Sequence, residues 1–268
     1  MREPADVQAR NVKVVDACRR HFADRESVTV CDLGTGTGAS LRAFADILPE
    51  RQHWTLVDHD KRNLAAAGEA LTAWADTATR SGDGLTLQRG PRQIEVALRV
   101  FDFAKDPAAA WTAETNLVTA SALLDLASKG WIARLANAVS KQKAAVLATL
   151  TFDGTIIADP THALDKSVAE AFCLHQTRNK GFGPAAGPDA ANVLQQSMER
   201  LGYKVVAGSS PWRLQDHTSK LFVRTVEGIA DAVRETGKVE LVDDWLEARL
   251  NHTRLLEIGH HDVFASRK

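Results

Sequence analysis

Two spacings of apolar residues alternate along the chain. Short apolar runs of strand length are separated by longer stretches in which apolar residues recur every three to four positions. The runs predict strands at 28–33, 54–57, 94–101, 116–125 and 144–152, and the stretches between them predict helices at 39–48, 62–80 and 128–139. Strands that alternate with helices are typical of a parallel sheet covered on both faces. We therefore expect an α/β protein built as a doubly wound, three-layer sandwich.

The flanking segments follow the same two spacings. A helix is expected over 6–22, and the pair Asp153-Gly154 is a hairpin signal that predicts a return strand at 155–158. Further helices are expected at 165–176, 189–201, 229–235 and 241–257, and further strands at 203–208 and 221–225. No stretch has the composition of a linker, so a single domain is expected over 1–268.

The most informative stretch is 28–38, where an apolar run ends in Asp32 and then in three alternating glycines, Gly34, Gly36 and Gly38. Glycine has no Cβ, so the backbone there can take positive φ angles and approach a ligand closely. A strand, a glycine turn and a helix begin a Rossmann-like nucleotide-binding unit. The alternative is an ordinary glycine-rich turn, which so short a pattern does not exclude.

Asp32 discriminates between two nucleotide ligands. The spacing Gly34-x-Gly36-x-x-Ala39 also fits the dinucleotide fingerprint, which predicts an NAD(P)-dependent oxidoreductase. A carboxylate does not stabilise an anionic pyrophosphate beside it, whereas it does stabilise a ligand that carries an ammonium and a sulfonium group. The pattern Asp32-x-Gly34-x-Gly36-x-Gly38 resembles motif I of the class I S-adenosylmethionine-dependent methyltransferases. The resemblance implies S-adenosylmethionine as cofactor and a mostly parallel seven-stranded sheet with a reversed last strand, here with extra terminal helices.

The resemblance extends over 28–125 and implies further cofactor contacts. Asp58 lies about 20 positions past the glycine loop, where a carboxylate can accept hydrogen bonds from both ribose hydroxyls, and Asp60 is expected to cap the next helix. The end of the third strand implies Asp102 for the adenine amino group and Phe103 for the ring, with a polar turn as the alternative for Asp102. The predicted cofactor-binding residues are Asp32, Gly34, Thr35, Gly36, Gly38, Asp58, His59, Asp102, Phe103, Thr119 and Ala120.

Two residues are candidate proton acceptors on the acceptor side. Asp125 follows the fourth strand and either accepts a proton from the attacking group or caps the helix near 128. His175 ends a helix before the Gly- and Pro-rich loop 175–189, where Arg178, Lys180 and Phe182 are candidate substrate-binding residues. The alternative is a solvated basic turn with a helix-terminal histidine. Beyond these, Trp212 is a candidate wall of the acceptor pocket or a core residue.

The absence of certain motifs and the net charge near zero argue against several classes of function. No Asn-Pro-Pro-Tyr-type or Asp-Pro-Pro-Tyr-type tetrad and no Pro-Cys pair follows the fourth strand, which argues against methylation of exocyclic base amino groups and of pyrimidine C5. The net charge of −1 and pI near 6.8 give no basic footprint for nucleic acid. Three cysteines without zinc spacing suit a reducing cytoplasm, and no metal is expected. His260-His261-Asp262 is interpreted as a solvated tail cluster. A soluble, cytoplasmic protein without a membrane segment is expected.

The predicted function is transfer of a methyl group by in-line displacement to a small-molecule acceptor bearing a carboxylate, phosphate or enolizable oxygen. The alternatives are an NAD(P)-dependent oxidoreductase, a noncatalytic cofactor- or partner-binding domain, and an RNA or protein methyltransferase. The acceptor atom and the oligomeric state are not predicted. The expected order is an N-terminal helix (1–24), a cofactor-binding half (25–150), an acceptor-side half (151–225) and C-terminal helices (226–268).

Overall fold

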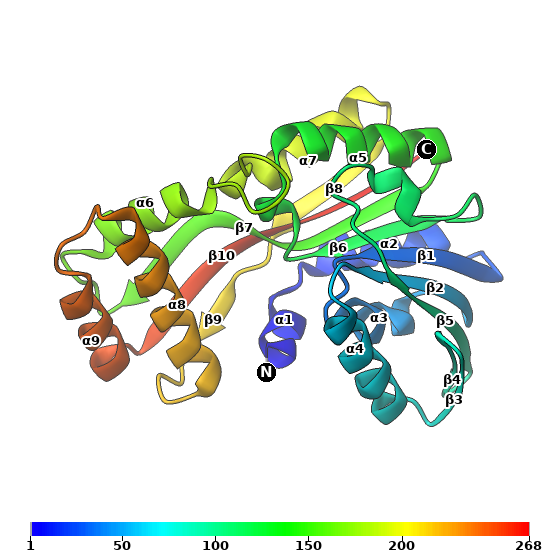
Figure 1. Ribbon diagram of the computed structural model, residues 1–268, viewed down its shortest axis with the longest axis horizontal. Coiled ribbons are helices and arrows are strands. Elements are labelled where there is room, and N and C mark those ends of the chain that lie inside the picture. The colour runs from blue at the N-terminus through cyan, green and yellow to red at the C-terminus, as the bar shows by residue number, and fades with distance from the viewer. Residues whose placement is uncertain (1, 268) are drawn as a thin grey trace.

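The computed structural model describes residues 2–267 and contains one mixed sheet with helices on both faces (Figure 1). The strands are β1 (Ser27–Leu33), β2 (Arg51–Asp58), β3 (Thr77–Ser81), β4 (Gly84–Arg89), β5 (Arg92–Val100), β6 (Leu117–Ser121), β7 (Ala145–Asp159), β8 (Lys204–Ser209), β9 (Trp212–Leu214) and β10 (Leu255–Ser266). Their order is β3-β4-β5-β2-β1-β6-β7-β10-β8, with β9 paired to β10. Strands β5, β2, β1, β6 and β7 run parallel, and β10 runs antiparallel between β7 and β8. The predicted α/β class and the reversed last strand are confirmed.

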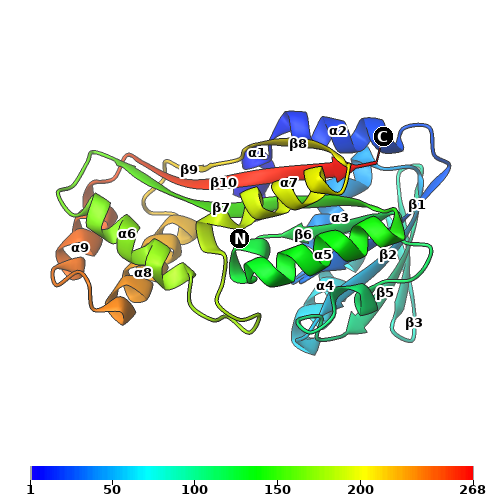
Figure 2. The same ribbon diagram turned by 90° about the horizontal axis from the view of Figure 1, so that it is seen from above.

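The helices fall into three groups (Figures 1 and 2). Their bounds are α1 (Glu3–Ala9), α2 (Val12–Phe22), α3 (Ala39–Phe44), α4 (Lys61–Trp74), α5 (Lys129–Gln142), α6 (Asp165–Gln176), α7 (Ala190–Arg200), α8 (Lys220–Thr236) and α9 (Val242–His252). Helices α2, α3 and α4 pack on one face of the sheet, and α5 and α7 pack on the other. Helices α6, α8 and α9 surround the far ends of β7 and β10 and form a third apolar cluster with them. No helix within 2–267 is long and apolar enough to cross a membrane.

The predicted hairpin at Asp153-Gly154 is wrong, because β7 continues through both residues. Ile258 of β10 pairs with Ile156, and His260 pairs with Phe152, so residues 153–155 form a bulge opposite residue 259 alone. Residue 259 is a glycine, and a Cβ there would overlap the carboxylate of Asp153. The missing side chain makes room for the bulge, and the strand bends instead of turning back.

Four further segments differ from the sequence expectation. The helix expected at 62–80 ends at Trp74, and the chain then forms the β3–β4 hairpin. The helix expected at 6–22 is divided into α1 and α2, because the side chain of Asn11 caps α2. The strand expected at 221–225 belongs to α8, which Ser219 caps by accepting a hydrogen bond from the N–H of Phe222. The helix expected at 241–257 ends at His252, and the residues after Arg254 form β10.

The cluster His260-His261-Asp262 lies inside β10 and is not a solvated tail. Asp262 is fully buried. Its Oδ1 accepts hydrogen bonds from the N–H of Leu150 (2.8 Å) and the hydroxyl of Ser210 (2.6 Å), and its Oδ2 accepts one from the N–H of Asn11 (2.8 Å). Leu150 is held in the left-handed region, with φ of 56°. One carboxylate therefore joins the bend in β7, the β8–β9 connection and the start of α2.

Replacement of Asp262 by alanine is expected to lower the free energy of unfolding by about 3 kcal/mol or more, because three donors lose a charged acceptor in a dry environment. Urea unfolding of D262A beside wild type measures this loss. D244A, which removes an exposed carboxylate from α9, is the control and is expected to stay within about 0.5 kcal/mol of wild type. A similarly small effect for D262A would contradict the structural role of Asp262.

Candidate functional site

The glycine loop lies at the carboxyl ends of the parallel strands. Gly34, Gly36 and Gly38 have φ angles of 66°, 54° and 74°, so all three glycines occupy the left-handed region that the sequence pattern predicts. The N–H of Gly36 donates to Oδ2 of Asp58 (3.0 Å), which fixes the loop against β2. A Cβ built on Gly36 would meet no atom within 4 Å. The backbone at Gly36 therefore faces open space, as close approach of a ligand requires.

Asp32 lies at the end of β1 with no exposed surface. The hydroxyl of Thr119, its register partner on β6, donates to Oδ1 (2.7 Å). Oδ2 has no hydrogen-bond partner within residues 2–267. Burial raises the pKa of Asp32 to about 6. A buried carboxylate with one free oxygen is stabilised by a cation, so this end of the loop favours a positively charged ligand group.

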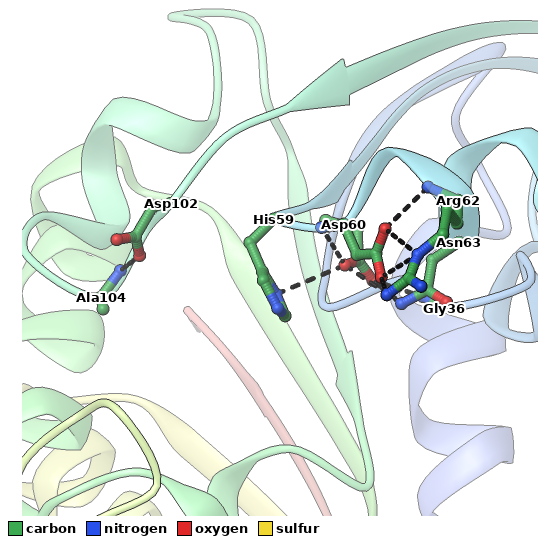
Figure 3. A network of polar contacts seen from close by, with 8 residues as sticks. Gly36, His59, Asp60, Arg62, Asn63, Asp102 and Ala104 are labelled. Atoms are coloured by element: carbon green, nitrogen blue, oxygen red, sulfur yellow. Dashed lines mark hydrogen bonds and ion pairs between the residues drawn. The ribbon is translucent and has the colours of Figure 1, made fainter.

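The carboxylate of Asp58 organises the end of β2 (Figure 3). Besides the Gly36 contact, it accepts hydrogen bonds from the N–H of Asp60 (2.9 Å) and the side-chain amide of Asn63 (3.2 Å to Oδ1). Asp60 caps α4 through the N–H of Arg62 (2.8 Å), as predicted. These hydrogen bonds hold the Asp58 carboxylate in place. A ribose diol that binds there would have to share the carboxylate oxygens with the glycine loop.

A pocket of about 240 Å³ opens beside this cluster. It is lined by His59, Asp102, Phe103, Ala104, Lys180, Gly181 and Phe182. In Figure 3, His59 lies between Asp60 and Asn63 on one side and Asp102 on the other. Five predicted site residues, from segments far apart in the sequence, therefore meet in one place.

The walls of this pocket are unequal in polarity. Phe103 is buried, and its ring centroid lies 5.9 Å from that of Phe182 and 6.1 Å from that of Trp131. Asp102 is exposed, and its Oδ1 accepts a hydrogen bond from the N–H of Ala104 (2.9 Å). One apolar wall opposite an exposed carboxylate suits a flat heteroaromatic ring with an amino group. Lys180 and Phe182, predicted as substrate-binding residues, line this same pocket.

A larger hollow of about 600 Å³ lies on the sheet face beside Thr29, His53 and Glu95. These residues are remote from the carboxyl ends of the strands, and the hollow contains none of the predicted site residues. Convergent polar groups mark a functional site more reliably than volume does, so we place the site at the strand ends.

Asp125 lies in a single turn of 3-10 helix directly after β6. Its side chain is buried, its Oδ1 has no partner within residues 2–267, and burial raises the pKa of Asp125 to about 6. The cap of α5 is Ser128, whose hydroxyl accepts from the N–H of Trp131 (3.2 Å), so Asp125 is not used in capping. A carboxylate with this pKa is half ionised near pH 6 and can accept a proton at neutral pH.

His175 and Arg178 have a different environment from the one expected for acceptor-binding residues. The Nε2 of His175 lies 3.0 Å from Oε2 of Glu235, and Arg178 donates to the same oxygen (3.0 Å) and to the Glu235 carbonyl (2.8 Å). These contacts join the end of α6 to the end of α8. Glu235 thus supplies a local function for both residues, and no contact joins either of them to the glycine loop.

No protein-family model and no curated protein matches the chain. Among solved structures, it is similar to a cyclopropane-fatty-acyl-phospholipid synthase-like protein from Lactobacillus casei, with 14% identity, 99% of this chain and 98% of that chain covered, and a TM-score of 0.56. It is also similar to a mycolic acid cyclopropane synthase complexed with SAH and CTAB, with 10% identity, 96% and 84% covered, and a TM-score of 0.50. A S-adenosylmethionine-dependent methyltransferase from Thiobacillus denitrificans has 15% identity, 96% and 92% covered, and a TM-score of 0.45.

The strand order agrees with this similarity over almost the full length of both chains. Five parallel strands are followed by a reversed strand inserted between β7 and β8. This is the fold of the class I S-adenosylmethionine-dependent methyltransferases. In the class I fold of this chain, β3 and β4 extend the sheet beyond β5, and β7 and β10 extend it toward α6, α8 and α9.

Sequence reasoning did not place Asp6, Trp212 and His260 together. Trp212 donates through Nε1 to Oδ1 of Asp6 (3.0 Å), and its ring centroid lies 5.2 Å from that of His260. Arg10 is partly buried, with its guanidinium carbon 5.1 Å from the centre of the Phe44 ring. The period-two spacing of Leu256, Ile258, His260, Asp262 and Phe264 was the available signal for β10.

Replacement of Thr119 by valine is expected to destabilise the protein by about 2 kcal/mol at pH 8 and by less at pH 5. The folded pKa of Asp32 is already raised above its unfolded value, so ionisation of Asp32 opposes folding as the pH rises from about 4 through 6. Loss of the Thr119 hydroxyl raises that pKa further and increases the cost where Asp32 is charged. Urea unfolding at both pH values measures the difference.

The matched control is T149V. Thr149 is as buried as Thr119, but its hydroxyl contacts the neutral hydroxyl of Ser121 (3.1 Å). The destabilisation caused by T149V is expected to be equal at pH 5 and pH 8. A T119V effect without pH dependence would show that Asp32 does not ionise in the folded protein in this range.

Proposed function

We propose that this protein transfers a methyl group from S-adenosylmethionine to a small-molecule acceptor. The observation that carries the proposal is Asp32, a fully buried carboxylate with one unpartnered oxygen beside a glycine loop in the left-handed conformation. A cationic amino-acid and sulfonium ligand would compensate the charge of Asp32, whereas the pyrophosphate of a dinucleotide would add to it. The class I fold supports the same choice.

The residues at the strand ends fit the parts of this cofactor. Asp32 and the backbone of the glycine loop would hold its charged end, with Thr119 and Ala120 of β6 alongside, and Asp58 would accept the ribose hydroxyls. The pocket formed by His59, Asp102, Phe103, Lys180 and Phe182 would enclose the adenine ring. This assigns Lys180 and Phe182 to the cofactor.

When bound, the cofactor supplies a methyl group attached to a good leaving group. The protein then has to align the acceptor, exclude water and remove a proton where the acceptor carries one. We assign proton removal to Asp125, because it is buried, its Oδ1 has no partner within residues 2–267, and it follows β6 directly. His175, the other predicted base, is engaged by Glu235 and is assigned a structural role together with Arg178.

Isothermal titration calorimetry is expected to show binding of S-adenosylmethionine and S-adenosylhomocysteine and no binding of NAD or NADP. The affinity for S-adenosylmethionine is expected to weaken about tenfold per pH unit below pH 6, because Asp32 must lose a proton to meet the cation. D32N is expected to bind at least about tenfold more weakly at pH 7.5 and to lose most of the pH dependence.

Two variants separate Asp32 from its surroundings. D125N removes the other carboxyl with a pKa of about 6 and is expected to leave the affinity for S-adenosylhomocysteine unchanged. D24N removes an exposed carboxylate and is the charge control. Tight binding of NAD, or an unchanged affinity of D32N for S-adenosylmethionine, would reject the proposed function in favour of the oxidoreductase alternative or of a domain with another ligand.

A further inference from the structure

Several buried polar atoms without hydrogen-bond partners belong to segments near the carboxyl ends of the parallel strands. Within residues 2–267 they include Oδ2 of Asp32, Oδ1 of Asp125, Oγ1 of Thr151, Nδ1 of His260 and Nε of Arg10. These residues belong to β1, the β6–α5 connection, β7, β10 and the residue that follows α1, which approach one another in the middle of the molecule (Figure 1). Buried polar atoms are almost always hydrogen-bonded, so a group of orphans marks the place of a bound molecule. Only the first of these orphans is explained by the cofactor.

Asp125 and His260 border the same residue of β7. His260 is the register partner of Phe152, and the backbone of Phe152 stabilises the charged form of Asp125. The ring of His260 lies against Trp212 of β9, and Trp212 is bonded to Asp6 of α1. The charge of Arg2, at the start of α1, acts on both Asp125 and His260, so these two side chains lie close to the start of α1. We call the polar region between them the α1 chamber.

The charges around the α1 chamber are mainly negative. Glu3 pairs with Arg42 at the end nearest the glycine loop, and Arg10 is stabilised by Asp6 and Asp262. After these pairs are counted, the negative charges of Asp125 and Asp153 remain, and the positive charge of Arg2 at the start of α1 partly offsets them. Carboxylates without a paired cation favour a cationic guest over an anionic one.

We propose that the α1 chamber is the acceptor site and that the acceptor is a small amine, bound through Asp125 and His260. This inference rests on the proposed function and names the acceptor class for the same site. It replaces the expectation of an anionic acceptor, which relied on Arg178 and Lys180. Arg178 is neutralised by Glu235, and Lys180 lines the adenine-sized pocket.

The step balances with the groups present. The ammonium form of the acceptor gives a proton to Asp125, and the nitrogen lone pair then forms the bond to the methyl carbon as the carbon–sulfur bond breaks. The electron pair of that bond stays on sulfur, so the products are a methylated amine and S-adenosylhomocysteine. Asp125 releases its proton to water when the product leaves.

His260 orients the acceptor and does not add positive charge. Burial lowers the pKa of His260 to about 4, while the nearby Asp153 opposes this and Arg2 reinforces it. The imidazole is therefore neutral at pH 7, and its unpartnered Nδ1 can hydrogen-bond an amine. Trp212, packed against the other side, limits the ring to one orientation.

The first test is direct binding, which does not depend on turnover. Wild-type protein saturated with S-adenosylhomocysteine is titrated with matched pairs of small amines and carboxylates, benzylamine against benzoate and butylamine against butyrate. The imidazole signals of ¹⁵N-histidine-labelled protein, assigned with the variant H260Q, are followed by NMR. The amines are expected to shift the His260 signal and the carboxylates are not. A shift caused by the carboxylates, or by none of the four probes, would overturn the proposal.

The second test identifies the product. A metabolite extract is incubated with the protein and methyl-labelled S-adenosylmethionine, and labelled products are separated by cation exchange and analysed by mass spectrometry. N-methylated amines are the expected result. Labelled esters or labelled anions would overturn the amine assignment and leave the proposed function standing, whereas failure of S-adenosylmethionine to bind in calorimetry would reject the proposed function itself.

Two substitutions of His260 distinguish a role in acceptor binding from a role in packing. H260N keeps a polar group near the position of Nδ1, and H260Q places it near Nε2. The KM for the amine is expected to rise about tenfold in H260Q and less than about threefold in H260N, with an unchanged affinity for S-adenosylhomocysteine in both. The matched control is H261N, the next residue of β10, on the opposite face of the strand. Equal losses in H260N and H260Q would indicate a packing role only and would contradict the assignment.

Discussion

The carboxylate of Asp262 is fully buried, and three hydrogen bonds from separate segments compensate its loss of solvation. Its contact with the N–H of Leu150 stabilises a left-handed backbone conformation that costs a non-glycine residue about 1–2 kcal/mol. Leu150 lies where the pairing of β7 with β10 departs from regular register, between His261 and Val263, and the contact with Asn11 holds the residue that caps α2. Because His260 lies two residues from Asp262 on β10, Asp262 helps to fix the part of β10 that carries His260.

A common electrostatic property links the two halves of the candidate site. Asp32 lies near the end of β1 and Asp125 follows the neighbouring strand β6; both are buried, and both keep one oxygen without a partner within residues 2–267. Burial raises the pKa of each to about 6, so each is more stable beside a cation than alone. A sulfonium donor would satisfy the first carboxylate, and an ammonium acceptor the second. Two cations that repel each other in water would thus be brought together by two carboxylates, one of which can remove a proton.

Local patterns allowed the glycine loop and the helix cap after it to be predicted, whereas other features depend on contacts between distant segments. The positive φ angles of Gly34 to Gly38 and the cap at Asp60 follow from residues within a few positions. The course of β7 past Gly154 depends on Gly259, more than a hundred residues away, and the environment of His175 depends on Glu235. Strand β10 has period-two spacing, but an amphipathic helix precedes it without a glycine or proline boundary, so helical spacing was extended into it.

Helix α1 has too few residues to be stable by itself, and only Asp6 and Ala9 of its residues are buried. It is held against the molecule by polar contacts, from Asp6 to Trp212 and from Glu3 to Arg42, and by the following Arg10 against Phe44. The hydrogen bond from Trp212 to Asp6 is buried, so it contributes more than an exposed polar contact would. The position of α1 therefore depends on a few polar side chains, whereas the register of β7 and β10 depends on strand hydrogen bonds and on the apolar cluster around them.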